Sequence, residues 1–233
     1  LTQFPEYKKN PDFNNEDKKE SFIKKNKLKF LREYQVKAIQ AIKDKIKNGG
    51  DRFLLEMATG TGKTNTSAAI IKMFLRLYKV KRVLFLVDRL ELETQAKKEF
   101  EEVLKNDFKT VIWKENKDDW RKAEIVISTV QSFTKHNKYK RIFQPNDFDF
   151  VISDEAHRSL GLRSRNVFEY FVGFKLGLTA TPRDFLKSVD ADNMSVSDPK
   201  QLERRLILDT YTIFGCEDGE PTFKYTLADG VKD

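Results

Sequence analysis

The chain has 233 residues, of which 39% are hydrophobic and 34% charged, so it holds enough apolar material for one sizeable core and wholesale disorder is excluded. Its net charge is +8, and the first fifty residues alone hold 13 Lys/Arg against 7 Asp/Glu, so the remainder is nearly balanced. No apolar run approaches the roughly 18 residues of a membrane span. One cysteine and two histidines exclude an internal disulfide and disfavour a metal cluster of those residue types.

Residues 1–27 are polar and show no sustained hydrophobic period, so we expect a loose N-terminal arm. Within it, Pro11-Asp12 followed by Glu16-Asp17-Lys18 imitates a nuclease motif. That chemistry needs its carboxylates and lysine on adjacent strands around a metal, and the polar flanks here predict no strands. The sequence therefore disfavours a nuclease site in the arm.

From Leu28 onward, helical and strand-like segments alternate. Apolar residues at helical spacing predict a helix from about Tyr34 to Ile46, and Gly49 with Gly50 stops it. Further helices are expected near 63–77 and 92–104, and short apolar runs predict strands at 53–57, 82–87, 110–113, 125–128, 148–153 and 175–178. Strands that are hydrophobic on both faces and alternate with helices predict a doubly wound α/β domain with a mainly parallel sheet.

Beyond residue 183 the alternating pattern is lost. Residues 184–200 are typical of an insertion or mobile loop. Residues 222–227 have the composition of a strand, but we place them outside the alternating core.

A glycine-rich turn follows the strand that ends at Met57, and its sequence is Ala58-Thr59-Gly60-Thr61-Gly62-Lys63-Thr64. A helix comes next, and this strand–loop–helix context is that of a phosphate-binding loop, whose backbone N–H groups face a polyphosphate. Lys63 is expected to reach the β- and γ-phosphates of ATP, and the Thr64 hydroxyl to bind Mg²⁺. Met57 stands where the general pattern has its first glycine. A turn that binds nothing is the alternative.

An acidic pair lies further along, where the strand near residues 148–153 ends in Asp154-Glu155-Ala156-His157. The carboxyl ends of parallel strands face the crevice in which α/β proteins bind ligands. Asp154 is expected to hold Mg²⁺, and Glu155 to orient and deprotonate the attacking water. An ordinary acidic strand end is the alternative, and the upstream phosphate loop weighs against it.

Three segments in this order resemble motifs I, II and III of superfamily 2 helicases and translocases: Thr59–Thr64, Asp154–His157 and Leu178-Thr179-Ala180-Thr181-Pro182. The resemblance covers roughly residues 28–183 and implies a sheet of the RecA-like P-loop type. It also implies that Thr179 and Thr181, with His157 as a partner, couple the nucleotide state to DNA contacts. A strand-end hydroxyl with a local structural bond is the alternative role for Thr179.

Three shorter segments resemble further motifs of the same superfamily. Leu31-Arg32-Glu33-Tyr34-Gln35 is similar to the adenine-reading segment, in which Gln35 would read adenine and Arg32 would assist. Val87-Asp88-Arg89 and Ser128–Ser132 are similar to motifs Ia and Ib/Ic, and they make Arg89 and Thr129 candidates for sequence-independent contacts with the DNA backbone. A polar helix start for Gln35 and a carboxylate partner for Arg89 remain open.

The finer resemblance is to the motor (R) subunit of type I restriction enzymes, and residues 85–92, 154–159 and 209–215 carry it. It implies that residues 28–183 are the first RecA-like domain of a larger polypeptide. Residues 184–233 would then be an irregular insertion and link toward a second motor domain. The implied partners are double-stranded DNA, that second domain, and modification and specificity subunits. A cytoplasmic protein of bacteria or archaea is expected, without a membrane partner.

The implied activity is ATP hydrolysis coupled to translocation of duplex DNA before site-specific cleavage, with ATP and Mg²⁺ as cofactors. In the family the arginine finger comes from the second domain, and loss of such a finger costs ~10³–10⁵ in turnover. We therefore expect nucleotide binding by this chain with little hydrolysis. The long spacing between Pro182 and Asp209 keeps a type III restriction subunit or a repair translocase open. A nucleotide-gated switch that does not translocate is the alternative of a different class.

Overall fold

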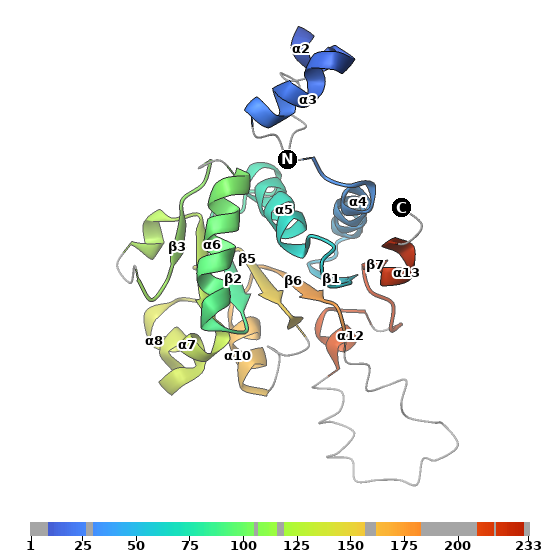
Figure 1. The fold of residues 1–233 in the computed structure, drawn as a ribbon. Coiled ribbons are helices and arrows are strands. Elements are labelled where there is room, and N and C mark those ends of the chain that lie inside the picture. The colour runs from blue at the N-terminus through green and yellow to red at the C-terminus, as the bar shows by residue number, and fades with distance from the viewer. Residues whose placement is uncertain are drawn as a thin grey trace, which may run out of the picture.

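A parallel β-sheet carries the fold (Figure 1). Among the described residues of this computed structural model it has seven strands in the order β3-β4-β2-β5-β6-β1-β7, and every neighbouring pair is parallel. The strands are β1 (Arg52–Met57), β2 (Val83–Val87), β3 (Thr110–Ile112), β4 (Ile125–Thr129), β5 (Phe150–Asp154), β6 (Phe174–Thr179) and β7 (Phe223–Tyr225). The structure describes residues 9–26, 30–104, 107–115, 119–156, 162–182, 209–216 and 218–230.

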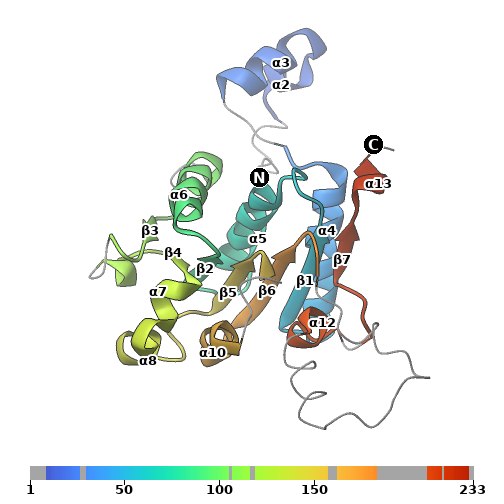
Figure 2. The same ribbon diagram turned by 60° about the horizontal axis from the view of Figure 1, so that its bottom comes forward.

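Helices cover both faces of the sheet (Figure 2). One layer consists of α4 (Glu33–Lys47), α5 (Lys63–Leu77) and α6 (Leu90–Leu104). The other consists of α7 (Val130–Thr134), α8 (Lys138–Ile142), α10 (Leu162–Tyr170) and α12 (Thr210–Ile213). The remaining short elements are the 3₁₀ turns η1 (Trp120–Lys122) and η2 (Lys135–Asn137), and the helices α2 (Pro11–Asn14), α3 (Glu16–Lys25) and α13 (Leu227–Gly230).

The two layers bury two separate apolar clusters, which explains the unbroken hydrophobic runs of the strands. Phe53 and Leu55 of β1 pack into the cluster beneath α4, α5 and α6, whereas Leu54 between them packs into the opposite cluster. Leu84 and Phe85 of β2 divide in the same way. Burying one such side chain contributes about 1.5–3 kcal/mol, so both faces add to stability. The predicted doubly wound α/β class and its six core strands are confirmed.

The described part of the N-terminal arm is helical, so the expectation of a loose arm is wrong there. Asn10 begins α2 by accepting a hydrogen bond from Asp12 N, and Asn15 begins α3 by accepting from Asp17 N and Lys18 N. These local caps do not need a hydrophobic period, which is why the pattern gave no sign of the helices. Figure 1 shows α2 and α3 set apart from the sheet.

The strand-like segment near residue 222 belongs to the sheet, and its expected place outside the core is wrong. β7 pairs in parallel with β1, and Met57 lies beside Tyr225. α12 adds buried Tyr211 and Ile213 to the cluster on the far face. Residues 209–225 are therefore part of the same fold, although the sequence interpretation assigned them to a link. The predicted insertion at 184–200 lies outside the described residues, and so does His157.

None of the helices in the described part of the chain has the length and apolar character that a bilayer crossing needs.

A substitution at Gly177 of β6 tests how Phe214, the residue after α12, packs against the sheet. A Cβ atom at Gly177 would lie 2.4 Å from the ring of Phe214, which is fully buried. Gly177→Ala is therefore expected to lower the free energy of unfolding by about 1–3 kcal/mol, the usual cost of overpacking. Urea unfolding measures this, and Phe214→Leu in the Gly177→Ala background should recover part of the loss. A Gly177→Ala chain as stable as the wild type would show that Phe214 does not lie against β6.

Candidate functional site

The residues predicted to bind nucleotide meet at the carboxyl edge of three neighbouring strands. β1 runs into the phosphate loop, β5 ends at Asp154, and β6 ends at Thr179. β6 pairs with both, so that Asp154 lies beside Leu178 and Glu56 beside Thr179. The parallel topology thus brings together groups that lie about ninety residues apart in sequence.

Two glycines shape the phosphate loop. Gly60 has a φ of 81° and Gly62 a φ of 75°, both in the left-handed region that L side chains rarely adopt. The Thr61 hydroxyl closes the turn by donating to Ala58 O at 2.7 Å. Nothing lies within 4 Å of the position of a Cβ atom on Gly60, so one side of the loop is open to a ligand.

Lys63 is the first residue of α5, and its buried ammonium group lies close to the end of β5. Its side chain is only 13% exposed, and its Nζ lies 3.3 Å from Glu155 Oε1. The contact is an ion pair without hydrogen-bond geometry, and among the described residues no other group accepts a hydrogen bond from this Nζ. A buried ammonium with unused donors costs free energy, and a phosphate would satisfy them. Lys63 therefore fits the terminal phosphates of ATP.

Asp154 and Glu155 form a strained acidic pair. Burial, reinforced by the charge of Glu155, raises the pKa of Asp154 to about 6, while the Lys63 ammonium acts in the opposite direction. Glu155 has a φ of 51°, and its backbone N donates to Asp154 Oδ1 at 3.1 Å. Left-handed backbone at a residue other than glycine persists only where the surroundings enforce it, and such residues cluster at functional sites. A divalent cation would favour the ionised form of Asp154.

The donor set fits Mg²⁺ bound together with a nucleotide. Within the described residues, no group of three or more His, Cys, Asp or Glu side chains could hold a metal ion. Mg²⁺ in nucleotide sites usually takes one or two protein ligands and completes its shell with phosphates and waters. Asp154 and the Thr64 hydroxyl at the start of α5 are the residues that would hold it.

Gln35 and Tyr34 of α4 anchor the phosphate loop. Gln35 Nε2 donates to Gly62 O at 3.2 Å, and Gln35 Oε1 accepts from Arg32 N at 2.9 Å. The Tyr34 hydroxyl donates to Thr61 O at 2.7 Å. The Gln35 amide is thus engaged with backbone groups and is 4% exposed. The adenine-reading role of Gln35 and Arg32 stays a prediction, and the structure adds an anchoring role that the sequence interpretation did not contain.

Tyr225 of β7 braces the same loop and was not singled out from the sequence. Its ring stacks on Tyr34 with a centroid distance of 3.9 Å and an angle of 14°. Its carbonyl accepts a hydrogen bond from Ala58 N at 3.1 Å, at the point where the loop begins. Beside it, Lys224 Nζ lies 2.8 Å from Glu56 Oε1. No local sequence pattern predicts this contact, because it depends on the pairing of β7 with β1.

The residues predicted to couple nucleotide and DNA are placed only in part. Thr179 is fully buried at the end of β6, and its hydroxyl accepts a hydrogen bond from Thr181 N at 3.1 Å. Thr181 is exposed in the loop that follows. The local bond of Thr179 matches its alternative structural role, and the coupling roles of Thr179, Thr181 and His157 stay predictions.

The two DNA-contact candidates differ sharply in exposure. Arg89 follows β2 with a side chain 68% exposed, and its Nε lies 3.9 Å from Asp88 Oδ2. Thr129, beside Val87 in the sheet, is 2% exposed, and its hydroxyl caps α7 by accepting from Ser132 N. Burial leaves the Thr129 side chain little surface for a phosphate contact. Both DNA contacts stay predictions, and Arg89 is the better placed.

Glu93 joins α6 to the carboxyl end of β4, and the sequence interpretation does not include this contact. Its carboxylate is 4% exposed and accepts a hydrogen bond from Thr129 N at 2.7 Å. Burial raises the pKa of Glu93, and the hydrogen bond from Thr129 opposes that shift. A glutamate in the first turn of a helix is normally solvated or interacts with the helix dipole, so no sequence pattern indicates this contact.

Comparisons with known proteins agree on the kind of domain. The family described as "Type III restriction enzyme, res subunit" matches residues 28–184. The type I restriction enzyme EcoKI endonuclease subunit of Escherichia coli K12 is 32% identical over 231 residues, covering 87% of this chain and 17% of the relative. The chain thus spans less than a fifth of that relative's length.

Two solved structures carry the same fold. The ATP-dependent Type ISP restriction-modification enzyme LlaBIII bound to DNA is 27% identical, with a TM-score of 0.53, covering 66% of this chain and 13% of that chain. The SWI2/SNF2 ATPase core of Sulfolobus solfataricus in complex with double-stranded DNA has a TM-score of 0.59 at 15% identity, covering 82% of this chain and 36% of that chain. At that identity the second likeness shows the fold alone.

Proposed function

The chain belongs to the family described as "Type III restriction enzyme, res subunit", and from this premise we propose that it is the ATP-binding first half of a superfamily 2 motor that moves along duplex DNA. One observation carries the proposal: the buried Lys63 ammonium lies against Glu155 at the end of β5, with Asp154 beside it. Cation, metal-binding carboxylate and basic carboxylate are the groups that phosphoryl transfer to water requires.

Each of these residues has a defined task in hydrolysis. Lys63 would bind the terminal phosphates, and a phosphate there would compete with Glu155 for the ammonium. The freed Glu155 carboxylate would orient a water molecule and accept its proton. Asp154 and the Thr64 hydroxyl would hold Mg²⁺, whose chemistry there would be to supply positive charge against the phosphates. Tyr34, Gln35 and Tyr225 would keep the loop in the shape that this arrangement needs.

The complete enzyme that we propose is the R subunit of a type I restriction enzyme. The curated relative named above is a type I endonuclease subunit, and its similarity extends over 87% of this chain, whereas the family match ends at residue 184. In such an enzyme a second RecA-like domain of the same polypeptide would supply an arginine finger and the other half of the DNA track. Modification and specificity subunits would direct the motor to its site, and cleavage of the DNA would follow translocation.

Triplex displacement tests this function. A polypeptide that contains this chain and the second motor domain, assembled with its partner subunits, is expected to strip a third strand from duplex DNA when ATP is added. Displacement should stop when a non-hydrolysable ATP analogue replaces ATP. ATP hydrolysis without displacement would contradict translocation and favour a nucleotide-gated switch.

Asp154→Asn is expected to stabilise the metal-free chain at pH 7. The pKa of Asp154 is about 6 in the folded chain and about 3.9 in an unfolded one. The folded chain therefore holds the proton more tightly, and the stability that this group contributes is present below pH ~4 and lost as pH rises through ~6. Removing the group should raise the free energy of unfolding at pH 7 by about 2–3 kcal/mol and change it little at pH 4.

Urea unfolding at the two pH values, with a metal chelator present, measures this difference. Asp119→Asn is the control, because Asp119 is half-exposed and the hydrogen bond from Lys122 lowers its pKa, so this substitution should show no gain at pH 7. A pH-independent effect of Asp154→Asn would contradict a raised pKa at this position.

A further inference from the structure

Residues 134–141 form a basic segment at the carboxyl edge of the sheet. This segment has no task in the nucleotide site. Residues 125–146 contain four Lys/Arg and no Asp/Glu, and the four are Lys135, Lys138, Lys140 and Arg141. They occupy η2 and α8, and Lys135, Lys140 and Arg141 are exposed while Lys138 is half-buried. None of the four makes an ion pair with another described residue. Such a concentration of unpaired cations attracts a polyanion.

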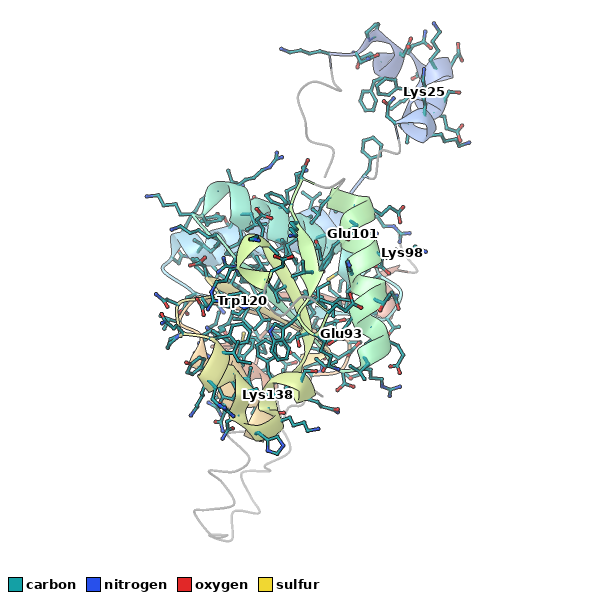
Figure 3. The ribbon with its side chains drawn as sticks, turned by 90° about the vertical axis from the view of Figure 1, so that its left-hand side faces the viewer. Lys25, Glu93, Lys98, Glu101, Trp120 and Lys138 are labelled. Carbon is teal, nitrogen blue, oxygen red and sulfur yellow. The ribbon has the colours of Figure 1, made fainter. Side chains whose placement is uncertain are left out.

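The sheet places this basic segment on the side of the molecule that carries Arg89. Thr129 is the N-cap residue of α7, and it lies beside Val87, two residues before Arg89. The chain then leads through α7 into η2 and α8. Figure 3 shows Lys138 toward the same end of the molecule as Glu93 in the first turn of α6, whereas Lys98 and Glu101 lie toward the opposite end of that helix.

A polar pocket opens in the basic segment. Thr134, His136 and Asn137 line it together with Asn166 of α10, and its volume is about 300 Å³. His136 and Asn137 both have left-handed backbone, with φ of 56° and 51°. The pocket is lined by hydroxyl, imidazole and amide groups, and lysines flank the turn on both sides, at positions 135 and 138. This combination of hydrogen-bond donors and cations is the kind that binds phosphate oxygens.

The segment exposes no phenylalanine or tyrosine ring on which a base could stack. Its aromatic side chains Phe133, Tyr139 and Phe143 are all buried, with at most 3% exposed. A site for single strands uses exposed aromatic rings on which bases stack. Exposed cations and amides beside these buried rings favour contacts with the phosphate backbone of a duplex, and such contacts do not depend on the base sequence.

We propose that residues 134–141, with Asn166, form a second binding site for the phosphate backbone of duplex DNA, on the side of the domain that carries Arg89. The site rests on the proposed motor function and extends it, because it makes α7, η2 and α8 part of the DNA track. Lys135 and Lys138 bind phosphates directly, and the pocket holds one phosphate between them.

A salt titration with a charge-reversed variant tests the site. Lys135→Glu/Lys138→Glu in the full chain is expected to weaken binding of a 30-base-pair duplex at least tenfold at low salt. The slope of log K against log[salt] should fall in magnitude by about two, since each lost phosphate contact removes ~0.9. The loss should be equal for two unrelated duplex sequences, and Mg²⁺–ATP affinity should stay unchanged. Lys135→Ala/Lys138→Ala should show a smaller loss of the same kind.

The matched control is Lys81→Glu/Lys98→Glu. It changes the net charge equally, and both lysines are exposed: Lys81 precedes the start of β2, and Lys98 lies toward the end of the molecule opposite Lys138 (Figure 3). An equal loss in the control and the test variant would overturn the site, and so would a larger effect on single-stranded DNA than on duplex. Arg89→Ala separates the two proposals. Weaker binding with Arg89→Ala but not with the test variant overturns the site alone, whereas no salt-sensitive duplex binding by the wild type overturns the motor function as well.

Discussion

Lys63→Met is expected to weaken Mg²⁺–ATP binding about 100-fold or more. The side chain supplies the cation for the terminal phosphates, and hydrogen bonds to charged groups are each worth about 1.5–3 kcal/mol. Its Nζ is buried and has no hydrogen-bond acceptor among the described residues, so the ammonium is already positioned for an anion. Calorimetric titration of the chain with ATP and Mg²⁺ measures the loss.

Lys72→Met is the matched control. Lys72 lies on the same helix, its side chain is also 13% exposed, and it forms an ion pair with Asp107 instead of with a residue of the site. This variant should bind nucleotide like the wild type. The stability of the Lys63→Met chain should change by no more than about 1 kcal/mol, because Glu155 is partly exposed and water screens the lost pair. Unchanged nucleotide affinity in Lys63→Met would show that this loop does not bind the phosphates of ATP.

Glu155→Gln is expected to separate nucleotide binding from hydrolysis. In a polypeptide that contains this chain and the second motor domain, ATP affinity should stay within a few-fold of the wild type, because the amide keeps the size of the side chain. Turnover should fall by about 10²–10⁴, the usual contribution of general base catalysis. Steady-state phosphate release and equilibrium nucleotide binding, measured on the same preparation, give the two quantities.

Glu101→Gln provides the comparison for this variant, since Glu101 is an exposed glutamate of α6 and belongs neither to the phosphate loop nor to the acidic pair. It should leave both quantities unchanged. If Glu155→Gln kept turnover within tenfold of the wild type, another group would have to activate the water.

The core of the sheet and the strand–loop–helix arrangement of the candidate phosphate loop could be predicted because their signals are local. Phe53, Leu54 and Leu55 are consecutive apolar residues, and only a strand covered on both faces buries all three. A single run of residues between β1 and α5 identifies the candidate phosphate loop. Asp154 at the end of β5 then follows from the rule that parallel strands gather ligand-binding groups at their carboxyl ends.

The contacts that shape this site could not be predicted, because each joins distant parts of the chain. Tyr225 meets Tyr34 across more than 190 residues, through a three-residue strand too short to show alternation. Glu93 finds Thr129 N only after α6 packs beside β4. The sequence predicts an adenine-reading role for Gln35, which stays a prediction, but not the hydrogen bond from its amide to the loop backbone. The sequence shows that such residues carry polar groups, but it does not show which groups they contact.

DNA-stimulated ATP hydrolysis shows whether this domain belongs to a DNA-driven motor. A polypeptide that joins this chain to the proposed second motor domain is expected to hydrolyse ATP slowly alone and many times faster when duplex DNA is added, with no stimulation in the Glu155→Gln variant. Hydrolysis at one rate with and without DNA, or no hydrolysis under either condition, would contradict the assignment of this domain to a DNA-driven motor.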